Sequence, residues 1–74
     1  MAMIRFNSKA LFNALDTERK KKNMTWKQVA LEIGISESTI IRTSKGGRME
    51  VDGMLAMVNW LRVPVETFIQ KVAQ

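Results

Sequence analysis

The sequence predicts an all-α fold of five short helices, which form one domain over residues 1–74. A chain of 74 residues has room for a single, thin hydrophobic core. Apolar residues make up 46% of it, which is normal for a folded domain, and they recur at helical spacing. Strand-like alternation is not sustained over any stretch, so no sheet is expected.

The first predicted helix runs from about Ser8 to Lys22, with Leu11 and Leu15 on its apolar side. Four consecutive cations, Arg19 to Lys22, lie where this helix ends. They complement the negative end of the helix dipole there, which explains them without any ligand. Asn23 follows, and asparagine tolerates the left-handed conformation that ends many helices.

The second predicted helix covers Trp26–Ile33 and has clear signals at both ends. Thr25 and Gln28 fit a capping box, in which each side chain binds the backbone N–H of the other residue. Gly34 ends the helix, because glycine adopts a positive φ at little cost. We therefore expect a sharp turn at Gly34.

The third predicted helix begins after Ser36, a typical N-cap residue, and runs from Glu37 to about Lys45, ending at Gly46-Gly47. Only three residues separate it from the second helix, so the two form a corner. The apolar side chains predicted inside that corner are Val29, Ala30, Ile33, Ile35 and Ile40.

The last third of the chain predicts two more helices. The fourth covers roughly Asp52–Leu61 and is expected to bury Met54, Leu55, Val58 and Leu61. Pro64 is the only proline, and its fixed φ suits the first turn of a fifth helix from Val65 to about Val72.

The segment TWKQVALEIGISESTIIRTSKG resembles the helix-turn-helix of the Cro and phage-repressor superfamily. The match lies in the spacing of Val29, Ala30, Ile33, Gly34, Ile35 and Ile40. The stretch VDGMLAMVNWLRVPVETFI is similar to the fourth helix, connector and fifth helix of that family. The departures are Thr43 at an apolar position, Ser44 at a frequent glutamate, Arg62 at the connector glycine and Pro64 at the capping serine. The resemblance implies a compact five-helix, lambda-repressor-like DNA-binding domain, with its helix-turn-helix (helices two and three) at about residues 25–45.

The resemblance also implies that the third helix lies in the DNA major groove. The predicted base contacts are Glu37, Ser38, Ile41 and Arg42. Arg42 can bind guanine or a phosphate. Glu37 can accept from cytosine or simply favour the helix N-terminus. Ile41 can touch thymine methyl groups or be partly buried.

Predicted phosphate contacts come from the start of the second helix, from the third helix and from the loop after it. They are Thr25, Trp26, Lys27, Thr39, Lys45, Gly46 and Arg48. Backbone N–H groups at a helix start attract anions. Trp26 can instead pack on the first helix, and Thr39 can do no more than occupy a first turn.

The charge is uneven along the chain, whose formal net charge is +5. Residues 1–48 hold ten Lys and Arg against four Asp and Glu, whereas residues 49–74 hold two against three. A basic part of this kind suggests a polyanionic partner, or else a merely soluble surface. Double-stranded DNA is the partner that the charge and the resemblance together favour.

The sequence lacks the residues on which several classes of function usually depend. The chain has no Cys and no His, and its carboxylates show no catalytic or ligand spacing, so neither an enzyme nor a metal or cofactor site is expected. No apolar run approaches the roughly 20 residues that cross a bilayer, and no small-molecule site is evident. The sequence thus suggests a cytoplasmic, DNA-binding transcriptional regulator, in particular a repressor. The alternative is an antitoxin or adaptor that mainly binds a protein.

The second half carries more apolar side chains than it can easily bury alone. A homodimer is the first explanation, since helix-turn-helix proteins commonly bind two half-sites. The predicted dimer contacts lie on the fifth helix and on the flank of the fourth: Trp60, Phe68 and Ile69.

Overall fold

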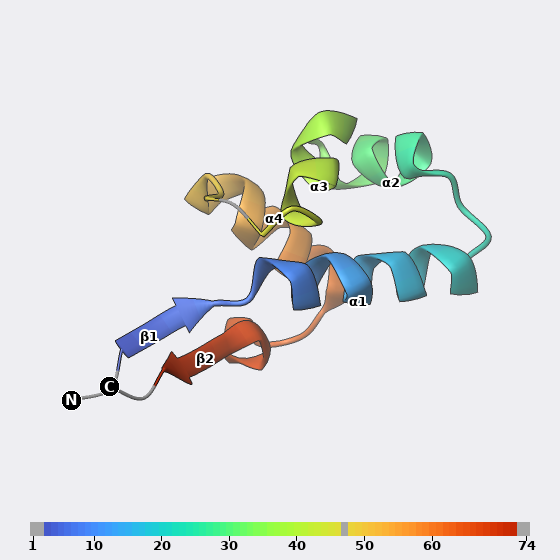
Figure 1. Cartoon of the computed structure of the whole chain (residues 1–74). Helices are drawn as coiled ribbons and strands as arrows, with labels where there is room; N and C mark the ends of the chain where they lie inside the picture. Colours follow the sequence, from blue (N-terminus) through green and yellow to red (C-terminus); the bar gives the residue numbers. More distant parts are fainter. Residues whose placement is uncertain (1–2, 47, 73–74) are drawn as a thin grey trace.

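The structure is a computed structural model that describes residues 3–46 and 48–72. In chain order it consists of β1 (Met3–Phe6), α1 (Ser8–Lys21), α2 (Trp26–Ile33), α3 (Glu37–Thr43), α4 (Val51–Leu61), the 3₁₀ helix η1 (Val65–Phe68) and β2 (Ile69–Val72). The described residues thus form a mostly helical fold with four α-helices and a small antiparallel sheet (Figure 1).

The predicted start of the first helix and both predicted ends of the second are confirmed, while α1 ends at Lys21, one residue before the predicted Lys22. The Asn7 side chain caps α1 by accepting a hydrogen bond from the Ala10 N–H at 3.0 Å. Asn23 ends the α1 turn with φ +57°, as expected. The capping box at α2 is complete, because the Gln28 N–H donates to Thr25 Oγ1 and the Thr25 N–H donates to Gln28 Oε1.

Helix α3 begins as predicted but ends at Thr43, two residues before the expected Lys45. The Ser44 N–H and hydroxyl both donate to the Ile41 carbonyl, at 3.1 and 2.7 Å. This i to i−3 pairing tightens the last turn and takes the chain out of the α-helical path. Gly46 then adopts φ +73°, whereas Gly47, also expected at this end, lies outside the described residues.

The core forms where α1 crosses the other helices. The buried apolar side chains are Leu11, Leu15, Val29, Ala30, Ile40, Met57, Val58 and Phe68. Leu55 is 48% exposed, so its predicted burial is wrong. The inward stripe of α4 follows the spacing i, i+3, i+4, i+7 from Met54 to Leu61, and Leu55 lies one position off that stripe.

The predicted fifth helix is wrong. Residues 65–68 form only the 3₁₀ turn η1, which Pro64 precedes with φ −66°. Residues 69–72 form β2, which pairs with β1 in the antiparallel register Met3↔Val72 to Phe6↔Ile69. The expectation of a fold without strands is therefore corrected as well. The two strands come from opposite ends of the sequence, so no local sequence pattern predicts their pairing.

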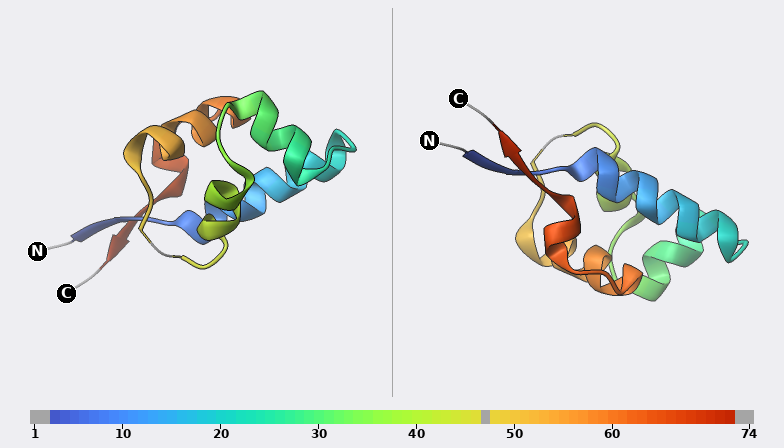
Figure 2. Two further views of the ribbon diagram at one scale, coloured as in Figure 1. Left: turned by 90° about the horizontal axis from the view of Figure 1, so that it is seen from above. Right: turned by 90° about the horizontal axis from the view of Figure 1, so that it is seen from below.

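The two-stranded sheet lies at one end of an elongated molecule of 42 × 20 × 18 Å, and its strands extend beyond the helices (Figure 2). Two of the contacts in the described part of the chain join it to the helical body. The rings of Phe6 and Phe68 lie 5.9 Å apart, and the Asn7 N–H donates to the Phe68 carbonyl at 2.7 Å. These contacts hold β1 next to the start of α1.

Candidate nucleic-acid interface

Helices α2 and α3 form the predicted corner. Gly34 makes the turn with φ +90°, a left-handed conformation that other residues adopt only at a cost. Val29, Ala30 and Ile40 are buried inside the corner. Ser36 begins α3 by accepting a hydrogen bond from the Thr39 N–H at 3.2 Å. The corner therefore holds α3 with one face on the core and the other in solvent.

The solvent face of α3 brings together the residues predicted to lie opposite Ile40. Five side chains from this face line one shallow depression: Glu37, Ser38, Ile41, Arg42 and Lys45. All five are exposed, including Ile41 at 37%. Ile41 is therefore partly covered by the protein and partly in solvent, so both alternatives for it stay open. Thr39 is half-buried, and its hydroxyl is hydrogen-bonded to the Ser36 hydroxyl at 2.7 Å.

The start of α2 presents one packed and two exposed side chains. The indole of Trp26 stacks on Phe12 with centroids 5.0 Å apart, and the Arg19 guanidinium lies 4.8 Å above the indole. The packing alternative for Trp26 is therefore well supported. Lys27 is exposed, as is Thr25, whose own N–H is already used in the capping box. Of the phosphate contacts predicted here, Lys27 is the most accessible.

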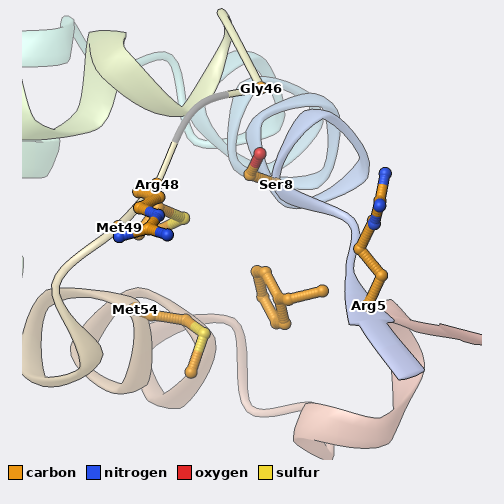
Figure 3. A pocket seen from close by; sticks show the side chains of 7 residues that line it. Arg5, Ser8, Gly46, Arg48, Met49 and Met54 are labelled. Atoms are coloured by element: carbon orange, nitrogen blue, oxygen red, sulfur yellow. The ribbon is translucent and has the colours of Figure 1, made fainter. Parts of the chain in front are cut away.

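The loop after α3 carries the remaining predicted phosphate contacts. Lys45, Gly46 and Arg48 are all exposed. Arg48 lines a small depression together with Arg42 and Thr39, so the loop is continuous with the solvent face of α3. Arg48 also lines a second, larger cavity next to β1 and the start of α1 (Figure 3). Arg5, Phe6 and Met49 also line this cavity, and the sequence predicted no role for them.

Several cations at the end of α1 form ion pairs with nearby carboxylates. Asp16 binds Arg19 at 2.7 Å and Lys20 at 3.2 Å, and Glu18 lies 3.6 Å from Lys22. The hydrogen bond from Arg19, followed by that from Lys20, lowers the pKa of the Asp16 carboxyl below its usual value.

The interface cations differ from those of α1. Within residues 3–46 and 48–72, no ion pair involves Lys27, Arg42, Lys45 or Arg48. Their charges are therefore available to a polyanion, whereas the run Arg19–Lys22 is partly neutralised at the helix end.

The predicted dimer residues occupy three different environments. Phe68 is 5% exposed and belongs to the core, so it cannot anchor a dimer in this structure. Trp60 is half-buried. Its Nε1–H donates to Glu32 Oε1 at 2.8 Å, and Lys22 Nζ lies 4.8 Å from the centre of its ring. Ile69 is 39% exposed on β2. More exposed apolar side chains lie on α4, where Val51 and Leu55 are 61% and 48% exposed.

Comparison with known protein families finds a match that includes this corner. A family model described as helix-turn-helix matches residues 15–46, from the second half of α1 to the turn at Gly46. No curated protein and no solved structure matched the chain. Among the helices described, none is long and apolar enough to cross a bilayer.

Proposed function

Because the chain carries a helix-turn-helix of the Cro and phage-repressor family over residues 15–46, we propose that it is a sequence-specific regulator of transcription that binds double-stranded DNA. The observation that carries the proposal is the solvent face of α3. It gathers donor, acceptor and apolar side chains on one exposed surface, with unpaired cations beside it. These are the groups that reading base edges in the major groove requires.

Each side chain on this face suits a particular base. The Arg42 guanidinium has two parallel donors for guanine O6 and N7, and Glu37 can accept from cytosine N4. The Ser38 hydroxyl can donate a hydrogen bond to a base edge or accept one from it. Ile41 offers apolar contact to a thymine methyl group, in keeping with its exposure.

Phosphate contacts fix the register of α3 on the duplex. Lys27 and the first N–H groups of α2 precede α3 in the chain, and Lys45, Gly46 and Arg48 follow the end of α3 at Thr43. Cations and free backbone N–H groups bind phosphates without reading sequence. Thr25, Trp26 and Thr39 have weaker support, because their side chains already make contacts within the protein.

We propose repression by occupancy, since a protein bound in the major groove of an operator excludes other proteins from it. We further propose that two copies bind together, in line with the two half-sites that helix-turn-helix proteins commonly occupy. The exposed pair Val51 and Leu55, one helical turn apart on α4, is the favoured contact.

The proposal is tested by titrating the folded protein with random-sequence duplex DNA at several salt concentrations, beside selection from a random DNA pool. We expect binding that weakens with salt, with a slope of about −0.9 in log–log form per phosphate neutralised, and a single enriched sequence. Absence of binding to any duplex in about 50 mM salt would contradict the proposal and favour the adaptor or antitoxin alternative.

A further inference from the structure

An exposed carboxylate lies beside the arginines of the candidate DNA surface. Glu50 lines the same small depression as Arg42 and Arg48, and all three side chains are exposed. Figure 3 shows Arg48 on the loop that leads into α4, the helix that begins directly after Glu50. A carboxylate is repelled by DNA phosphates, so a surface that only attracts phosphates does not explain this residue.

The start of α4 does not account for the Glu50 side chain either. Glu50 is the N-cap residue of α4, but its side chain makes no capping hydrogen bond. The positive end of the helix already has Asp52 in its first turn. Within residues 3–46 and 48–72, no ion pair involves Glu50. Its charge therefore acts on its neighbours through space, without a fixed contact.

The effect of this charge depends on what each neighbouring arginine binds. Charges that line one small depression interact, because screening at physiological ionic strength acts over about 8 Å. A carboxylate offsets part of the positive charge of a nearby guanidinium and thereby weakens its Coulomb attraction to a phosphate. The hydrogen bonds of Arg42 to guanine O6 and N7 depend more on geometry and less on that charge, because guanine is neutral.

We propose that Glu50 is a specificity-determining residue, which weakens the binding of Arg42 and Arg48 to phosphates more than the binding of Arg42 to a base. Sequence-independent binding to a duplex is essentially electrostatic, so the carboxylate mainly lowers the affinity for duplexes that lack the selected sequence. The ratio of specific to non-specific affinity rises as a result. This role rests on the proposed function and adds to it a residue that needs no DNA contact of its own.

The test compares Glu50→Gln with the wild type on the selected duplex and on random-sequence duplex, each at several salt concentrations. We expect the affinity for random duplex to rise roughly threefold to fivefold and that for the selected duplex to rise less than about twofold. The salt slope for random duplex should become steeper, by at most about 0.9. Urea unfolding checks that the variant is folded, which the exposure of Glu50 and its lack of a capping hydrogen bond favour.

Glu66→Gln is the matched control, because it removes the same charge from the chain at another place. Glu66 is exposed in η1 and does not line the depression that holds the two arginines. The control should keep the wild-type ratio of the two affinities. Glu50→Asp keeps the negative charge at the start of α4 and should also keep most of that ratio.

A second measurement asks whether Glu50 acts through the arginines. Glu50→Gln is introduced into a chain that carries both Arg42→Ala and Arg48→Ala, and binding to random duplex is measured at low salt. If the carboxylate acts by offsetting the charge of these two side chains, its replacement should now change the affinity by less than about twofold.

The outcomes distinguish this role from the function on which it rests. If no duplex binds the wild type, both fail. If the wild type selects a sequence and Glu50→Gln keeps the ratio of affinities, the role of Glu50 alone is wrong. Equal effects of Glu50→Gln and Glu66→Gln would assign the change to net charge and overturn the role. A full effect of Glu50→Gln without the two arginines would mean that the carboxylate repels phosphates directly, which also overturns it.

Discussion

Arg42 and Arg48 line one small depression, but they belong to different kinds of structure. Arg42 is on the solvent face of α3, beside Glu37 and Ser38, whereas Arg48 lies in the loop that follows the helix. A helix lying in the major groove points its side chains at base edges, and the loops at its ends meet the backbone. The two arginines should therefore contribute differently to specificity.

We expect Arg42→Ala to cost about 1–3 kcal/mol of binding free energy on the selected site and to remove discrimination at one base pair. Arg48→Ala should weaken all duplexes similarly and lower the salt slope by about 0.9. Repeating the DNA selection with each variant measures both effects. If Arg48→Ala, and not Arg42→Ala, loses base preference, the loop reads the sequence and the assigned orientation is wrong.

Of the described residues with left-handed backbone conformations, Gly34 and Arg62 have opposite consequences for stability. Gly34 has φ +90° and Arg62 has φ +59°. No atom lies within 4 Å of a Cβ placed on Gly34, so Gly34→Ala should cost about 1–2 kcal/mol from backbone conformation alone. Arg62→Gly should stabilise by about 0.5–1 kcal/mol, because it relieves the same strain at the end of α4. Urea unfolding measures the change in the free energy of unfolding for both variants. A change in the same direction for both would contradict this assignment of backbone strain.

The Asp16 carboxylate links stability to pH. Its pKa in the folded protein is lowered from 3.8 by the hydrogen bonds from Arg19 and Lys20, so the unfolded chain takes up a proton first as pH falls. The stabilisation is therefore complete well above pH 3.8 and is lost as pH falls through the lower folded value. Asp16→Asn should be less stable than the wild type at neutral pH, and the difference should shrink in acid. Thermal melts between neutral pH and the acid range test this, and a constant difference would contradict it.

At the scale of elements, the sheet and the helical body depend on one aromatic side chain. Phe68 ends η1, packs on Phe6 and accepts the Asn7 N–H through its carbonyl. It therefore connects β1, the start of α1 and the last turn. The adjacent Ile69 begins β2 and is 39% exposed.

We expect Phe68→Ala to cost about 3–5 kcal/mol of the free energy of unfolding, because it leaves a cavity between the sheet and α1. Ile69→Ala should cost about 1 kcal/mol or less, since much of its side chain is already in water. Urea unfolding gives both values. Amide exchange at Asn7 reports whether the hydrogen bond to Phe68 is lost. Equal costs for the two variants would mean that the aromatic contact does not hold the sheet.

At the scale of the whole molecule, unpaired cations and exposed apolar side chains occupy different elements. The cations lie on α3, on the loop after it and around the start of α1, whereas Val51 and Leu55 lie on α4. A DNA surface and a contact between copies can therefore coexist on one chain.

Leu55→Glu should leave the chain folded and reduce its association on a two-half-site duplex, because a charge would enter the proposed apolar contact. Leu31→Glu is the control, since Leu31 is 74% exposed on α2 and away from that contact. Sedimentation of both protein–DNA complexes measures the stoichiometry. A wild-type complex with a strict monomer would refute the proposed pairing.

Prediction from sequence worked best where neighbouring residues decide the structure. The capping box at Thr25, the turn at Gly34 and the cap at Ser36 each depend on contacts within about one helical turn. Once α3 is known to begin at Glu37 with Ile40 buried, helical geometry places Arg42 on the solvent face. The corner and the outer face of α3 were therefore predictable.

The sequence by itself determined the starts of α1 and α3, both ends of α2, the corner and the charge asymmetry. Local hydrogen bonds and side-chain size specify the helix ends and the corner, and the residue types alone set the charge. Only the tertiary structure decided that residues 69–72 form a strand, that Phe68 is buried and that β1 and the loop after α3 line one cavity. A four-residue segment is too short to distinguish the period of a strand from that of a helix. Its backbone groups are satisfied by β1, more than 60 residues away, and a pairing across that distance leaves no local pattern in the chain.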